Sequence, residues 1–90
     1  MYTIVTPKQF LRQANKFFKK HPGMRQTFAE VADELMKDPF NPGLKLHQLK
    51  GKLSGLSAVS LTYSYRIVLT IKITKKEIIL IDIGSHDEVY

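Results

Sequence analysis

His47, Arg66 and His86 are the residues of this chain whose side chains could together cleave a phosphodiester bond in RNA. Attack by the 2′-hydroxyl needs one proton removed from that hydroxyl and another delivered to the leaving 5′-oxygen, and imidazole is the side chain that titrates near neutral pH. A guanidinium can bind a phosphate through two hydrogen bonds and stabilise the charge on a pentacovalent phosphorus. These residues therefore form a candidate catalytic set that needs no metal.

Tyr90 is a further candidate, because an aromatic ring can stack on a nucleobase. Each of the four residues also has a structural interpretation. A single histidine in a loop is more often a hydrogen-bonding surface residue, Arg66 could form a surface ion pair with Asp82, and Tyr90 could close the core. Only the two histidines together support a catalytic interpretation.

Polar and basic residues near these candidates could bind a phosphate backbone. Lys45, Lys50 and Lys52 lie in a connector punctuated by glycines, and Ser60 and Ser64 alternate with apolar residues in the segment that follows. The alternative is that the lysines belong to a solvated loop and the serines to the hydrated face that an antiparallel sheet needs.

The composition favours a polyanionic partner. The 90 residues contain 14 Lys and Arg against 8 Asp and Glu, which gives a formal net charge of +6. The length suits one domain, residues 1–90. Without cysteine, an apolar leader or a run of membrane-spanning length, we expect a cytoplasmic protein with no disulfide and no membrane partner. No glycine-rich phosphate loop or metal-ligand cluster occurs, so we expect no cofactor.

Two helices are predicted in the first half of the chain. Residues 6–9 fit a capping box with Thr6 as the N-cap, so the first helix should begin at Pro7. Its apolar residues recur at helical spacing, and its basic residues take the outward side. The same periodicity predicts a second helix from Met24 to Lys37, ended by Pro39.

Strands are predicted on both sides of the helices. A short one covers Tyr2 to Val5, and from Leu56 the apolar residues recur with a period of two, which places Tyr63 among the buried positions. The alternation repeats from Tyr65 to Ile73, and an apolar run from Ile78 to Ile83 follows a turn. The order β-α-α-β-β-β predicts an α+β two-layer sandwich, in which a helical hairpin packs on a small antiparallel sheet.

Three segments of the second half carry a family resemblance: LHQLKG at 46–51, YRIV at 65–68 and GSHDEVY at 84–90. They resemble, in that order, the H-x-L-x-G segment, the arginine-bearing strand and the G-[ST]-H ending with a terminal aromatic that occur in the RelE/ParE superfamily. This superfamily consists of toxins from bacterial type II toxin–antitoxin systems, and the likeness is to its YafQ-like mRNA interferases. The two predicted helices match the family in length and order.

The resemblance implies a RelE-like fold and a toxin without a cofactor, which enters the ribosomal A site and cleaves mRNA there through 2′-hydroxyl attack. Its partners would be the mRNA, ribosomal RNA and a cognate antitoxin that silences it. His47 and His86 would be the histidines that act as general acid and general base. Arg66 would be the arginine that stabilises the transition state, and Tyr90 the aromatic residue that orients the nucleobase. We expect His47 to be the general base and His86 the general acid.

Ser60 and Ser64 depart from the family pattern, because the YafQ-like branch has a histidine and an aspartate there. A serine hydroxyl does not titrate near neutral pH, so it cannot serve there as a proton carrier in catalysis. Two alternatives therefore stay open. One is a ParE-like toxin that poisons DNA gyrase and is not a nuclease, and the other is a catalytically weakened scaffold that still binds RNA.

Overall fold

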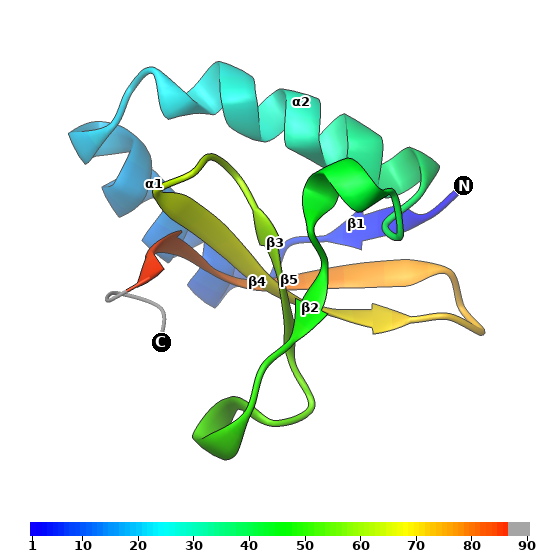
Figure 1. Ribbon diagram of the computed structural model, residues 1–90. Coiled ribbons are helices and arrows are strands. Elements are labelled where there is room, and N and C mark those ends of the chain that lie inside the picture. The colour runs from blue at the N-terminus through cyan, green and yellow to red at the C-terminus, as the bar shows by residue number, and fades with distance from the viewer. Residues whose placement is uncertain (87–90) are drawn as a thin grey trace.

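A computed structural model describes residues 1–86 of the protein, and it has two helices and a five-stranded mixed sheet (Figure 1). The elements, in chain order, are β1 (Thr3–Val5), α1 (Lys8–Lys20), α2 (Met24–Lys37), β2 (His47–Gln48), β3 (Ser57–Ser60), β4 (Tyr65–Lys72) and β5 (Glu77–Ser85). Short 3-10 helices follow α2 at Pro42–Leu44 (η1) and β2 at Gly51–Leu53 (η2). The predicted α+β two-layer sandwich is confirmed.

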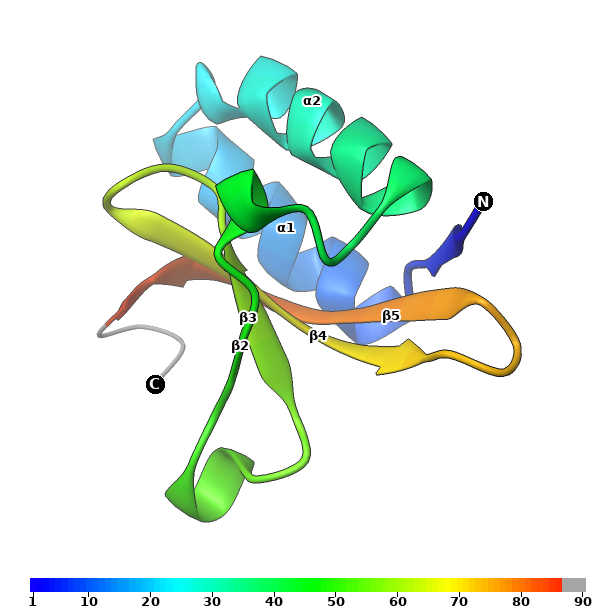
Figure 2. The ribbon, with the colours of Figure 1, turned by 45° about the vertical axis from the view of Figure 1, so that its right-hand side comes forward.

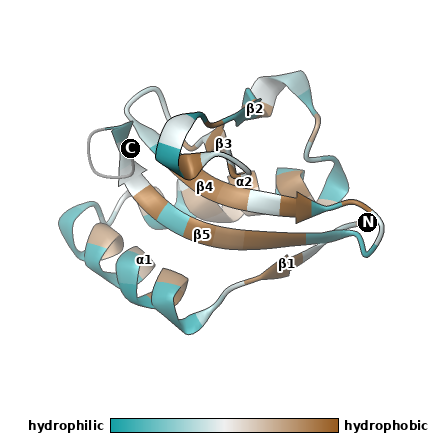
Figure 3. Ribbon diagram, turned by 90° about the horizontal axis from the view of Figure 1, so that it is seen from below, coloured by the Kyte–Doolittle hydropathy of each residue, from teal (hydrophilic) through white to brown (hydrophobic). Residues whose placement is uncertain are grey.

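The sheet has the strand order β1-β5-β4-β3-β2. The strands β3, β4 and β5 form the expected antiparallel meander. β1 is parallel to β5 and pairs only with its first residues, from Thr3 opposite Glu77 to Val5 opposite Ile79. The second half of β5 therefore has no strand on its outer edge, and α1 runs alongside it (Figure 3).

The main core lies between the helices and the sheet. From the helices it takes Phe10, Ala14, Phe17, Phe18, Val31 and Leu35, and from the sheet Val59, Leu61, Ile67, Leu69, Ile78, Leu80 and Ile83. A β-bulge in β5 keeps Leu80 and Ile83 on this face although they are three residues apart, because the register with β4 shifts between Val68 and Leu69.

The helix limits agree with the sequence pattern except at one cap. α2 covers Met24–Lys37 as predicted, and α1 begins at Lys8 with Pro7 as its N-cap. The predicted capping box is wrong, because Pro7 occupies the N-cap position and no side chain caps the helix. Proline fits there because its backbone has no N–H to satisfy, and its carbonyl accepts a hydrogen bond from the Leu11 N–H at 3.0 Å.

The strand pattern was misleading in two places. Tyr63 is 99% exposed, because β3 ends at Ser60 and the chain turns over residues 61–64 before β4 begins. The apolar alternation thus continues through a turn. The sequence also did not predict β2, whose two residues are exposed and pair with β3 at the end of the sheet.

The face of the sheet opposite the helices, here called the outer face, carries a second apolar cluster. Leu49, Ala58 and Val68 are buried there, and Leu53, Leu56 and Ile81 pack against them. Leu49, Leu53 and Leu56 come from residues 46–56, here called the arm. The arm extends away from the helices in both views and folds its leucines back onto the sheet (Figures 1 and 2). The outer face is therefore not uniformly hydrated.

Within residues 1–86, neither helix is long and apolar enough to cross a membrane.

Ile67→Ala should lower the free energy of unfolding by about 2–5 kcal/mol, because it leaves a cavity in the main core. Ile67 has 0% exposure, whereas Ile73, just beyond the same strand, is 63% exposed. Ile73→Ala is the matched control and should change stability by no more than about 0.5 kcal/mol. Equilibrium urea unfolding measures both values, and equal losses would contradict the assigned core.

Candidate RNA-binding and active site

Arg66 lies on the outer face, where small residues flank it on both sides. Val68 belongs to the outer cluster, and residues two apart on a strand share a face, so Arg66 lies on the same side as Val68. Its cross-strand partners are Ser60 on β3 and Gly84 on β5. Neither neighbour has a bulky side chain, so the guanidinium has space to meet a phosphate on this face.

His47 lies on the arm, together with the basic residues of the connector. His47, Lys50 and Lys52 line one surface hollow of about 370 Å³, along with Gln48, Leu49 and Leu53. The backbone carbonyl of Lys45 also lies beside this histidine, 3.0 Å from its Nδ1. All three lysines are exposed. The structure thus places Lys50 and Lys52 beside one histidine, with the backbone of Lys45 next to it.

The hydrogen bond to Lys45 fixes the tautomer of His47. A backbone carbonyl can only accept, so Nδ1 must carry the hydrogen that the bond requires. In the neutral ring Nε2 is then the basic nitrogen. This is the protonation pattern that a general base needs.

His47 and His86 lie far apart. The register runs straight across the sheet from His47 through Ala58 and Val68 to Asp82. His86 follows Asp82 by four residues along the chain. At ~4.8 Å between strands and ~3.3 Å per residue, the α-carbons of the two histidines are roughly 20 Å apart. Both imidazoles can contact one phosphodiester only after the arm brings His47 closer to Arg66.

Arg66 lies between the two histidines and closer to His86. The same strand geometry places its α-carbon roughly 8 Å from that of His86 and roughly 12 Å from that of His47. Ser85 pairs with Tyr65, the first residue of β4, so the exposed His86 follows directly at the end of the sheet that carries Arg66. Tyr90 lies outside the described residues.

The two predicted serines occupy different environments. Ser60 is half-buried and pairs with Arg66, so it is adjacent to the guanidinium-bearing residue. Ser64 is exposed in the turn before β4, where its N–H donates to the Thr62 hydroxyl at 3.2 Å. Ser60 is therefore the better placed of the two for contact with a ligand of Arg66.

A third histidine lies near this end of the sheet. Nδ1 of His21, at the C-terminus of α1, is 3.3 Å from the hydroxyl of Tyr65, the residue before Arg66. The His21 ring lies 4.9 Å from that of Phe17 and 4.8 Å from that of Tyr65, measured between centroids. His21 is not among the residues that the sequence selects, and no local signal indicates its contact with Tyr65, 44 residues later.

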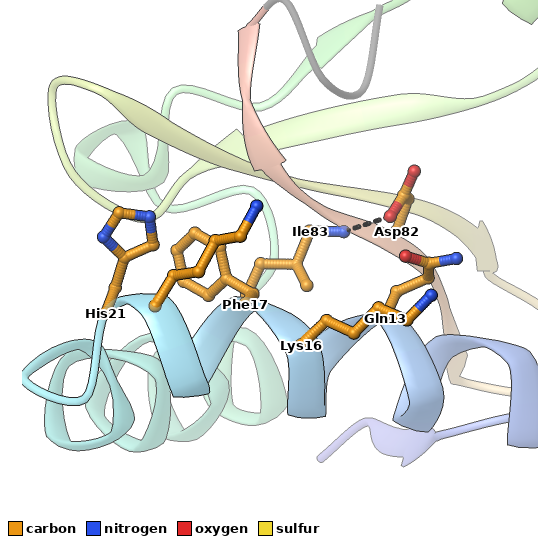
Figure 4. Close-up of a pocket in the computed structure, with 7 residues that line it drawn as sticks. Gln13, Lys16, Phe17, His21, Asp82 and Ile83 are labelled. Atoms are coloured by element: carbon orange, nitrogen blue, oxygen red, sulfur yellow. Dashed lines mark hydrogen bonds between the residues drawn. The ribbon is translucent and has the colours of Figure 1, made fainter.

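A cavity of about 290 Å³ lies between α1 and the second half of β5 (Figure 4). Its lining consists of Gln13, Lys16, Phe17, Lys20, His21, Asp82 and Ile83. The helical pattern placed Lys16 on the outward side of α1, and Lys20 follows one turn later at the C-terminal end of the helix. Both are exposed, but they also border the edge of β5 that no strand covers.

The charges of the two helices differ strongly. α1 contains five basic residues and no acidic one. α2 contains three acidic residues and two basic ones, and its Lys37 is paired with Asp33 at 3.0 Å. The positive charge of the helical layer is therefore concentrated beside β5. Among residues 1–86, no three His, Cys, Asp or Glu side chains are grouped as ligands for a metal ion.

Solved structures of bacterial toxins are similar to this chain over its whole length. A metal-bound toxin from Helicobacter pylori is 30% identical over 100% of both chains, with a TM-score of 0.79. YafQ in the Escherichia coli DinJ–YafQ complex is 14% identical, with coverages of 100% of this chain and 99% of that one and a TM-score of 0.77. A YoeB/ParE toxin from Agrobacterium tumefaciens is 18% identical, with coverages of 93% and 98% and a TM-score of 0.74. No protein-family model and no curated protein sequence matches the chain.

The neutral His47 ring should be in the Nδ1–H tautomer, because its Nδ1 donates to the Lys45 carbonyl. Histidine side chains without such a bond favour Nε2–H, so the two states are distinguishable. Long-range ¹H–¹⁵N NMR at alkaline pH, with His47→Gln to assign the signal, measures the tautomer. A majority of Nε2–H at His47 would contradict the assignment of Nε2 as the basic nitrogen.

Proposed function

This chain belongs to the RelE/ParE superfamily of bacterial toxin–antitoxin toxins, and we propose that it is an endoribonuclease that cleaves mRNA on the ribosome and so inhibits translation. The reaction is attack of a 2′-hydroxyl on the adjacent phosphorus, with departure of the 5′-oxygen and no metal or cofactor. The toxin acts in the cytoplasm, where it meets ribosomes.

The position of Arg66 is the observation that supports this proposal most. It lies on the outer face between Ser60 and Gly84, with His86 at the end of the neighbouring strand. A guanidinium there can bind the scissile phosphate through two hydrogen bonds and stabilise the charge that develops on phosphorus. His86 is within reach of the same phosphate and can protonate the 5′-oxygen as general acid.

His47 takes the role of general base only when the arm closes. Its Nε2 is the basic nitrogen of the neutral ring, but its α-carbon is roughly 12 Å from that of Arg66 in the present conformation. The three exposed lysines on and beside the arm are attracted to the RNA backbone, and this attraction supplies a reason for the arm to move when RNA binds. Tyr90 is proposed to orient the nucleobase beside the phosphodiester that is cleaved.

A cognate antitoxin is the proposed protein partner. The similar toxin YafQ was solved in a complex named DinJ–YafQ. An inhibitor that prevents the arm from closing over Arg66, or that covers the outer face, would block the reaction without any change in the core.

Cleavage of mRNA on programmed ribosomes, followed under single-turnover conditions, tests the function. His86→Ala and Arg66→Ala should each slow cleavage by about 10²-fold or more, because one removes the general acid and the other the group that stabilises the transition state. His47→Ala should slow it by a similar factor if the arm closes. Lys75→Ala, in the turn between β4 and β5, removes one charge at the opposite end of the sheet and should leave the rate unchanged.

Absence of cleavage by the wild-type protein would reject the nuclease function, and wild-type rates in His86→Ala would remove His86 from the mechanism. A normal rate in His47→Ala with a strong loss in His86→Ala would show that the arm histidine is not the base.

The separation of the two histidines favours a second candidate, a ParE-like toxin that poisons DNA gyrase. Protein binding does not require two imidazoles to meet at one phosphate. Under this alternative, gyrase-dependent DNA damage should persist in the His47→Ala/His86→Ala double variant. A scaffold that only binds RNA would instead cause no growth arrest when it is expressed alone.

A further inference from the structure

We infer that the cavity between α1 and β5, here called the α1–β5 cleft, is a second phosphate subsite that holds the RNA backbone beside the step bound by Arg66. The inference rests on the proposed RNA substrate and extends it to a surface that the candidate catalytic residues do not include. Lys16 and Lys20 line the cleft one helical turn apart, and His21 lies next to them. These are donors and cations suited to a phosphodiester.

The charge around the cleft is positive because α1 contains no acidic residue. Basic residues recur every four positions along the helix, at Lys8, Arg12, Lys16 and Lys20, and therefore form one row on its surface. The second half of this row borders β5, where no strand covers the edge. Single-stranded RNA that binds along this row of basic residues therefore reaches the cleft.

The acceptors of the cleft favour RNA over an acidic peptide. Asp82 lines it, and the Ile83 N–H donates to Oδ1 of Asp82 at 2.8 Å, which holds the carboxylate in place. In Figure 4, Gln13 and Lys16 reach from α1 toward Asp82, whereas His21 lies at the other end of the cavity beyond Phe17. The fixed carboxylate can accept a hydrogen bond from a base amino group of RNA, whereas the side chains of Asp and Glu have no donor to offer it.

His21 is held in position before any ligand binds. Its ring lies against Phe17 and Tyr65, and its Nδ1 is engaged by the Tyr65 hydroxyl at 3.3 Å. Nε2 is consequently the nitrogen available to a ligand in the cleft. A side chain fixed by packing and by a hydrogen bond on its other ring nitrogen loses little entropy when it binds a phosphate.

The cleft is continuous with the surroundings of Arg66. Asp82 pairs with Val68, so it is the diagonal neighbour of Arg66 on the outer face, and diagonal neighbours lie roughly 7–8 Å apart. Tyr65, which holds His21, directly precedes Arg66. A phosphate in the cleft and one at Arg66 can therefore belong to the same short stretch of RNA.

Two double variants with the same loss of charge test the inference. Lys16→Ala/Lys20→Ala removes the lysines of the cleft, and Lys19→Ala/Lys75→Ala removes two exposed lysines that neither line the cleft nor belong to the basic row of α1. The probe is a short single-stranded 2′-O-methyl oligoribonucleotide, which cannot be cleaved by 2′-hydroxyl attack, and fluorescence anisotropy measures its Kd over a range of salt concentrations. Urea unfolding verifies that both variants are folded.

The cleft variant should bind about tenfold more weakly, and the slope of log Kd against log salt should fall by about 1.4, the value for two lost single-strand phosphate contacts. The matched variant should show clearly smaller changes. On programmed ribosomes the cleft variant should need more protein for half-maximal cleavage, with an unchanged rate at saturation.

Equal losses in both variants would overturn the subsite, because they would indicate a general effect of charge. Normal RNA binding by the cleft variant, together with weakened binding of the antitoxin, would overturn it in favour of an acidic peptide. If the wild-type protein does not cleave mRNA, the proposed function fails, but the binding experiment still decides whether the cleft holds RNA.

Discussion

The division of β5 between two neighbours is the constraint on which the rest of the structure depends. Its first half pairs with β1 along the outer edge, and its second half packs beside α1. The bulge at the middle of the strand lets Leu80 and Ile83 both face the core. This arrangement anchors α1, forms the α1–β5 cleft, and carries the chain to His86 at the end of the sheet where β4 begins and Arg66 lies.

The outer face combines a rigid centre with a projecting arm. Arg66 is part of the meander, whose strands are fixed on the other side by the main core. His47 lies on the arm, which is held to the sheet by the small cluster around Leu49 and by a two-residue strand. A few apolar contacts and hydrogen bonds give such a segment less local stability than the meander. The chemistry proposed here thus divides between a preformed phosphate site and a base that binding must bring to it.

The sequence predicted those features that depend on local patterns. Apolar spacing and the stop at Pro39 located α2, and the alternation of β4 identified the face that carries Arg66. Features that depend on contacts between distant segments were not predictable in this way. The exposed β2 has no apolar signal, the pattern through Tyr63 continued into a turn, and the contact of His21 with Tyr65 exists only because α1 ends beside β4 and β5. For the candidate site, residue types were informative, whereas the distance between His47 and His86 required the strand register.

The most direct test of the central claim is a structure of the protein on a ribosome whose mRNA has its attacking 2′-hydroxyl blocked. The guanidinium of Arg66 and the imidazole of His86 should both contact the scissile phosphate from the outer face. An mRNA path over the acidic surface of α2, or a scissile phosphate that neither Arg66 nor His86 contacts, would contradict the central claim.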